Sequence, residues 1–149
     1  MAQTYIHGEG DEALQIRGDE REYWAIVAAA YEVSHEEGFE VGRFVSQTYL
    51  AFKSADTQED RLNISLQTSE VLGGTLNTVD HPNRVGEYVR YKRDLAALTD
   101  EERAFCRLAI RTAEPYCMKY YARTLDKEDR NGNVAEALIT SSQLMALLS

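Results

Sequence analysis

The stretch "RAFCRLAIRTAEPYCMKYYAR" (residues 103–123) joins a helical apolar pattern to a row of arginines. Arg103, Arg107 and Arg111 follow one another at four-residue intervals, so on a helical wheel they span about 80°. The residues on the opposite side of the wheel, which we expect to face a core, are Phe105, Leu108, Ala109 and Thr112. Like charges at this spacing repel on a helix, which predicts that an anion binds and neutralises the arginines.

Helical patterns cover most of the remaining chain and predict an all-α fold, a compact bundle of about six helices in one domain over residues 1–149. The expected helices begin near Asp19, after Ser34 and near Asp56, and then cover 84–98, 100–113, 115–125 and 134–148. Thr99 and Glu102 have the spacing of a capping box, and Pro115 suits the first turn of a helix. The Gly73–Gly74 pair is expected to end a helix, which leaves 73–83 as the longest loop.

Three segments carry more local predictions. Residues 1–18 contain two short strand-like runs, Thr4–His7 and Ala13–Arg17, which predict a short β-hairpin or a flexible N-terminal arm. The run Tyr23–Tyr31 is apolar nearly all round and predicts the most buried helix. Residues 61–68, "RLNISLQT", fit either a helix or a strand, and the capping signal before them favours helix.

The chain is acidic, and its charge is unevenly distributed. The net charge is −9, with 5 basic and 15 acidic residues over 1–83 but 11 basic and 9 acidic residues over 84–130. This acidity disfavours nucleic acid as a partner, because phosphate contacts need a positive field. No apolar run approaches the roughly 20 residues that cross a bilayer, and the first residues lack a signal-peptide pattern. We therefore expect a cytoplasmic protein without membrane contact.

No segment carries a complete catalytic or metal-binding motif. Residues 127–138, "KEDRNGNVAEAL", resemble a calcium loop at Asp129 and Asn131, but a lysine and a leucine occupy its first and last ligand positions. Glu32 and His35 form one E-x-x-H pair, and the second pair that a di-iron bundle needs is absent. The sequence therefore predicts no cofactor and no metal.

The arginine row, with the tyrosines and basic residues around it, is the best candidate for a binding surface. The candidate interaction or anion-binding residues are Arg90, Arg93, Arg103, Arg107, Arg111, Tyr116, Tyr120 and Arg123. Three counterparts remain open: acidic residues of the same chain (Glu36, Glu37 and Glu40, or the Asp19–Glu22 turn), an acidic partner protein, or a small anionic ligand such as a nucleotide or another phosphate.

These residues favour a non-enzymatic protein-interaction module or inhibitor that acts through a Tyr/Arg-rich helical surface, by binding another protein or by self-association. Accessory and counter-defence proteins of mobile elements are often small, acidic and free of motifs, which is an analogy of type only. A binder of a small anionic ligand is the first alternative. An enzyme with an unrecognised site is the second, and it is weakened by the lack of a recognisable nucleophile and base.

Overall fold

The computed structural model describes residues 20–124 and 127–149, and within them the side chains of 23–119 and 136–149. The elements are α2 (Glu20–Ser34), α3 (Val41–Ser54), α4 (Gln58–Val79), the 3₁₀ helix η1 (Pro82–Arg84), α5 (Val85–Ala96), α6 (Asp100–Thr124) and α7 (Lys127–Leu147). These residues form no strand, so the prediction of a helical bundle with about six helices is confirmed. The predicted hairpin or arm over 1–18 lies outside the described residues.

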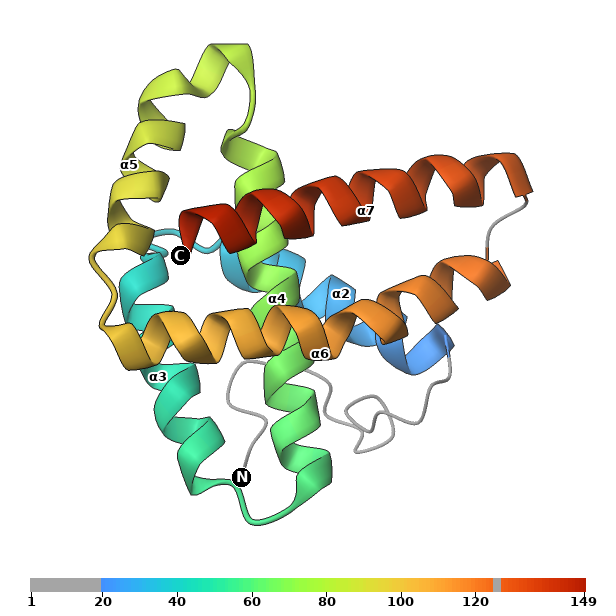
Figure 1. Cartoon of the computed structure of the whole chain (residues 1–149), viewed down its shortest axis with the longest axis horizontal. Helices are drawn as coiled ribbons and strands as arrows, with labels where there is room; N and C mark the ends of the chain where they lie inside the picture. The colour runs from blue at the N-terminus through green and yellow to red at the C-terminus, as the bar shows by residue number, and fades with distance from the viewer. Residues whose placement is uncertain (1–19, 125–126) are drawn as a thin grey trace.

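The central helix of the bundle is α4 (Figure 1), which contacts α2, α3, α5, α6 and α7. The ambiguous segment 61–68 lies within α4 and is therefore helical. Its residues 63–68 are all buried. Its buried hydroxyl groups bond within the helix; the Thr68 hydroxyl, for example, donates to the Ile64 carbonyl at 2.7 Å. The prediction that Tyr23–Tyr31 forms the most buried helix is wrong, because Trp24 and Tyr31 are exposed on the outer side of α2.

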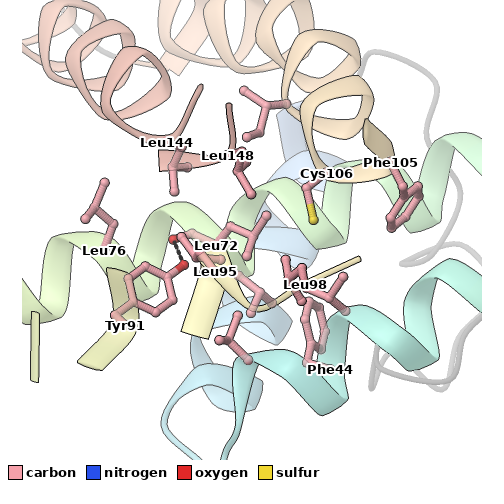
Figure 2. Packing of buried hydrophobic residues seen from close by; sticks show 14 of the residues in the cluster. Phe44, Leu72, Leu76, Tyr91, Leu95, Leu98, Phe105, Cys106, Leu144 and Leu148 are labelled. Atoms are coloured by element: carbon pink, nitrogen blue, oxygen red, sulfur yellow. Dashed lines mark hydrogen bonds between the residues drawn. The ribbon is translucent and has the colours of Figure 1, made fainter. Parts of the chain in front are cut away.

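Two apolar clusters hold the helices together. The larger one lies where α3, α4, α5, α6 and the end of α7 meet (Figure 2), and its fully buried side chains include Leu72, Leu76, Leu95, Cys106 and Leu148. Tyr91 belongs to this cluster, and its hydroxyl group donates to the Leu72 carbonyl at 2.9 Å. The smaller cluster joins α2, α4 and α6 and contains Tyr23, Ile26, Ala29, Leu66 and Ala113. Each large buried side chain stabilises the fold by roughly 1.5–3 kcal/mol relative to an exposed one.

The glycine pair in α4 does not end a helix, which corrects the sequence prediction. α4 continues through Gly73 and Gly74 to Val79, so most of the loop expected over 73–83 is helical. Gly73 faces α7, where a Cβ atom would lie at an ordinary contact distance of 3.5 Å from the Cγ2 atom of Thr140.

α6 is one continuous helix, although the sequence predicted two helices separated near Pro115. The Thr99–Glu102 capping box that begins it is confirmed, with Glu102 N donating to Thr99 Oγ1 at 3.1 Å and Thr99 N donating to Glu102 Oε1 at 3.0 Å. Pro115 stands inside the helix on its exposed side, where water can bond the carbonyl group that loses its main-chain donor. α7 likewise begins at Lys127 and not near residue 134, so residues 127–133, which were expected to precede the last helix, are helical.

Candidate functional site

The buried side of α6 determines where its arginines lie. The buried residues of this helix are Phe105, Cys106, Ala109, Ile110 and Ala113, whereas Leu108, which was expected to face the core, is exposed. The core side is therefore rotated toward Cys106 and Ile110 relative to the prediction. As a result Arg111 points to solvent, while Arg103 and Arg107 flank the core at the junction with α5 and α7.

Arg103 binds the end of α5. Its Nη1 atom donates to the carbonyl groups of Ala96 at 3.0 Å and Leu98 at 2.6 Å, and its Nη2 atom pairs with Asp100. The last carbonyl groups of a helix have no partner within the helix and carry partial negative charge. Only 21% of the Arg103 side chain is exposed, so this cation works as a cap that joins α6 to α5.

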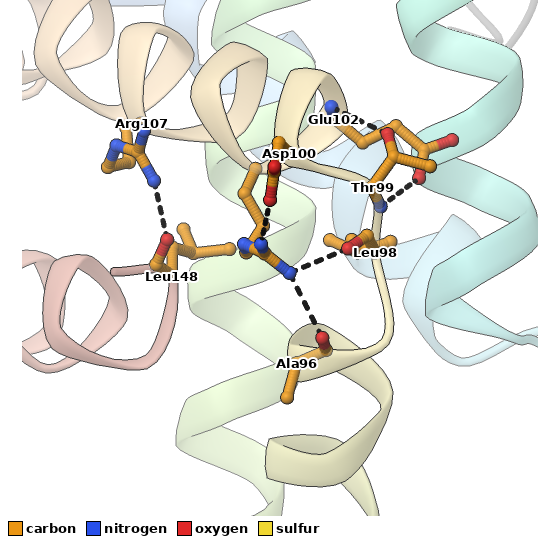
Figure 3. A network of polar contacts seen from close by, with 8 residues as sticks. Ala96, Leu98, Thr99, Asp100, Glu102, Arg107 and Leu148 are labelled. Atoms are coloured by element: carbon orange, nitrogen blue, oxygen red, sulfur yellow. Dashed lines mark hydrogen bonds and ion pairs between the residues drawn. The ribbon is translucent and has the colours of Figure 1, made fainter.

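Arg107 caps the end of α7 in the same way (Figure 3). Its Nη1 atom donates at 2.5 Å to the carbonyl oxygen of Leu148, one residue beyond the end of α7. The side chain of Leu148 is fully buried in the larger apolar cluster. Arg107 therefore fixes the C-terminal end of the chain against the middle of the bundle.

For two members of the arginine row the structure shows a counterpart that the three alternatives did not include. Main-chain carbonyl groups at two helix ends accept hydrogen bonds from Arg103 and Arg107. Glu36, Glu37 and Glu40 do not bind them. Glu40 instead pairs with Arg43 at 3.3 Å on the surface. These carbonyl groups come beside the arginines only when α5 and α7 pack on α6, and a count of charged side chains does not include their partial charges.

The other candidate residues do not gather at one place. Arg90, Arg93 and Arg111 are exposed, and none of them forms an ion pair with a residue in the described part of the chain. Tyr116 is half-buried against the smaller apolar cluster. The side chains of Tyr120 and Arg123 lie outside the described residues.

Arg90 lines a groove of about 450 Å³ between the end of α2 and α5. Arg84 and His35 also line this groove, and its carboxylates come from Glu36, Glu40, Glu87 and Asp94. Arg84 is already paired with Glu87 at 3.3 Å. Four carboxylates against two arginines make the groove a poor match for a small anion, because like charges repel the ligand.

The outward side of α5 has a composition that the sequence analysis missed. Val85 and Val89 are 62% and 53% exposed, and they lie on one face with three exposed residues of the second half of the helix, Lys92, Arg93 and Ala96. We call these five residues the α5 outer face. The four-residue spacing of the two valines places them on one side of the helix, but only the buried positions of Tyr91 and Leu95 show that this side faces outward.

A polar cavity of about 140 Å³ lies between α4, α6 and α7. Glu70, Glu114 and Glu136 line it, together with Cys117. The Tyr23 hydroxyl group donates to a carboxylate oxygen of Glu70, which ties α2 to α4 behind the cavity. This cluster was not visible in the sequence, because its members come from four helices.

The chemistry of this cluster follows from its burial. Burial raises the pKa of Glu70, and the hydrogen bond from Tyr23 opposes that rise. Burial, and then the neighbouring Glu70 carboxylate, raise the pKa of Tyr23 well above its ordinary value. Tyr23 therefore keeps its proton at neutral pH, and the pair serves as a hydrogen-bonded link between helices.

Neither a metal site nor a membrane span is found in the described residues. No three of their histidine, cysteine, aspartate and glutamate side chains are placed to hold a metal ion together. None of the described helices is both long enough and apolar enough to cross a bilayer. Comparisons with protein-family models, with curated protein sequences and with solved structures gave no significant match.

Proposed function

We propose that this protein is a non-enzymatic protein-interaction module and that the α5 outer face is its contact surface. The observation that carries the proposal is the exposure of Val85 and Val89 next to Lys92 and Arg93. Exposed aliphatic side chains gain free energy when a partner covers them, and an arginine at their edge can bind an acidic group of that partner. The proposal keeps the basic helical surface inferred from sequence but moves its centre from α6 to α5.

The position of α5 supports this assignment. In Figure 1 the helix runs along one edge of the molecule, and its inward side packs on α3, α4 and the end of α7. Tyr91 and Leu95 anchor that inward side in the core. The outer face is therefore held in a fixed orientation by a buried helix side, so a partner would meet a surface that needs little ordering on binding.

The positions of the other candidate residues also support a contact surface on α5. Arg103 and Arg107 are engaged with main-chain carbonyl groups, so a partner would have to break those bonds to use them. Arg111 is exposed beside one exposed large aliphatic side chain, Leu108 at 42%, whereas Arg93 shares its helix side with Val85 and Val89 at 62% and 53%. The larger exposed aliphatic area therefore lies on α5.

The proposal is tested by site-specific photo-crosslinking in the cells that make the protein. A photoreactive amino acid at position 89 is expected to give a discrete adduct of higher mass, because Val89 lies at the centre of the α5 outer face. The matched control places the same amino acid at Gln143, which is exposed on α7. Equal labelling at both positions, or no adduct at position 89, would count against the proposal.

A further inference from the structure

The outward side of α2 carries an aromatic and acidic surface that is distinct from the α5 outer face. Trp24 and Tyr31 are 58% and 65% exposed. The Tyr31 ring stacks on His35 with a centroid distance of 4.1 Å, and the His35 Nδ1 atom lies 2.9 Å from the Tyr31 carbonyl oxygen. These contacts hold the two rings in place on the helix surface. Trp24, Ala28, Tyr31 and His35 form what we call the α2 outer face.

Two carboxylates follow directly after this face. Glu36 and Glu37 are exposed just beyond the end of α2, and neither forms an ion pair with a residue in the described ranges. Negative charge at the C-terminal end of a helix is unfavourable, because the last carbonyl groups already carry partial negative charge. The fold therefore gives no stabilising role to this acidic end, and a cation from outside would relieve it.

The α2 and α5 outer faces match in spacing and are complementary in character. Trp24, Ala28, Tyr31 and His35, the last one residue beyond α2, are spaced at i, i+4, i+7 and i+11, and so are Val85, Val89, Lys92 and Ala96 of α5. Each row is about 16 Å long at 1.5 Å per residue. One row is aromatic and ends in carboxylates, and the other is aliphatic in its first half and cationic in its second half.

We propose that the α2 outer face of one molecule packs, in parallel, against the α5 outer face of a second copy of the chain. This inference rests on the proposed function, since it names the partner of the same α5 surface. In the parallel arrangement the expected opposite pairs are Trp24 with Val85, Ala28 with Val89, Tyr31 with Lys92 and His35 with Ala96. The Glu36–Glu37 end then lies about one helical turn beyond Arg93. Tyr31 and Lys92 would form a cation–π contact, and the acidic end would meet the basic end.

A contact between two different faces has a consequence for assembly. Each molecule offers α5 to one neighbour and α2 to another, so the contact is heterologous and builds rings or open chains, unlike the paired patches of a two-fold dimer. In Figure 1, α2 lies behind α4 and α6, whereas α5 lies along one edge. The α5 outer face and Trp24, Tyr31 and His35 are exposed in the single molecule, and Ala28 is partly exposed, so the two faces do not cover each other within it.

Trp24 makes the contact directly observable, because it is the single tryptophan of the sequence. As the purified full chain is concentrated from micromolar to millimolar, its tryptophan emission should shift to shorter wavelength while light scattering reports a rising mass. Val89→Glu should abolish both changes, because the new carboxylate would be buried against Ala28 in the middle of the contact, without a cation opposite it. The matched control Lys119→Glu changes charge on an exposed residue of α6 and should keep both changes.

A mixing experiment separates a heterologous contact from any other kind. Trp24→Glu blocks α2, Val89→Glu blocks α5, and each variant alone should be monomeric with a native circular dichroism spectrum. Mixed in equal amounts, they retain one intact pair of faces and should form a dimer with twice the monomer mass and no larger species. A mixture that stays monomeric, or a wild-type chain that stays monomeric at millimolar concentration, would overturn the inference. Capture of a different protein at position 89 by such a monomer would leave the proposed function standing.

Discussion

Arg103 is the residue whose removal tests the structural reading of the arginine row most simply. Arg103→Ala deletes two hydrogen bonds to the carbonyl groups of Ala96 and Leu98 and the ion pair with Asp100. A hydrogen bond to a charged group contributes about 1.5–3 kcal/mol, and a cation near a helix C-terminus adds about 0.3–1 kcal/mol. The side chain is 21% exposed and water can reach part of the freed surface, so we expect a net loss of about 2 kcal/mol.

The assay is urea unfolding followed by circular dichroism at constant pH, with thermal unfolding as a second measurement. A loss of about 2 kcal/mol should lower the melting temperature by roughly 4–8 °C in a chain of this length. Arg103→Lys keeps the charge but cannot reach both carbonyl groups with a planar fork, so it should lose about half as much.

Arg111→Ala is the matched control for this series. It removes the same side chain from the same helix, where Arg111 is exposed and bonds no described residue. We expect a change within about 0.5 kcal/mol, as for an ordinary surface substitution. Equal losses for Arg103→Ala and Arg111→Ala would refute the assignment of Arg103 as a cap.

Three further predictions concern the helices around this row. Pro115→Ala should stabilise the protein by about 1–2 kcal/mol in urea unfolding, because the alanine N–H can rejoin the helix at an exposed position; an unchanged midpoint would contradict this. Glu70 has a native pKa raised above 4.5, so folding favours its neutral form. The free energy of unfolding should therefore fall as pH rises from 4.5 through the raised pKa. The slope should be at most about 1.4 kcal/mol per pH unit. Glu70→Gln should flatten that part of the stability profile while still accepting the Tyr23 hydrogen bond, and an unchanged slope would exclude Glu70 as its source. Burial raises the pKa of the Cys106 thiol to about 12. In a Cys117→Ser background this thiol should therefore react with a disulfide reagent only at the rate of unfolding. Immediate labelling would contradict its burial.

Local sequence signals predicted the helices well where a side chain acts on its own backbone. Thr99 and Glu102 specify the start of α6 through hydrogen bonds within one turn, and the structure contains both bonds. Gly73 and Pro115 misled the prediction, because α4 and α6 continue through them. Core packing of Val71, Leu72 and Leu76 holds α4 on both sides of Gly73, and Pro115 lies on an exposed side of α6.

The binding surface was harder to predict, because the use of a charged side chain depends on which backbone groups pack beside it. Arg103, Arg107 and Arg111 look alike in sequence, but helix ends engage the first two and leave the third in solvent. The exposed pair Val85 and Val89 could be recognised only once the inward side of α5 was known. Tertiary packing therefore decides which of several similar patterns remains free to bind.

The central claim is that the α5 outer face, and not the arginine row of α6, is the contact surface. The most direct test compares photo-crosslinking yields in native cells for the same photoreactive amino acid at Val89 and at Arg111, two exposed positions on neighbouring helices. We expect one discrete adduct at position 89 and background labelling at position 111. A strong adduct at position 111 with none at position 89 would contradict the claim and return the contact surface to α6.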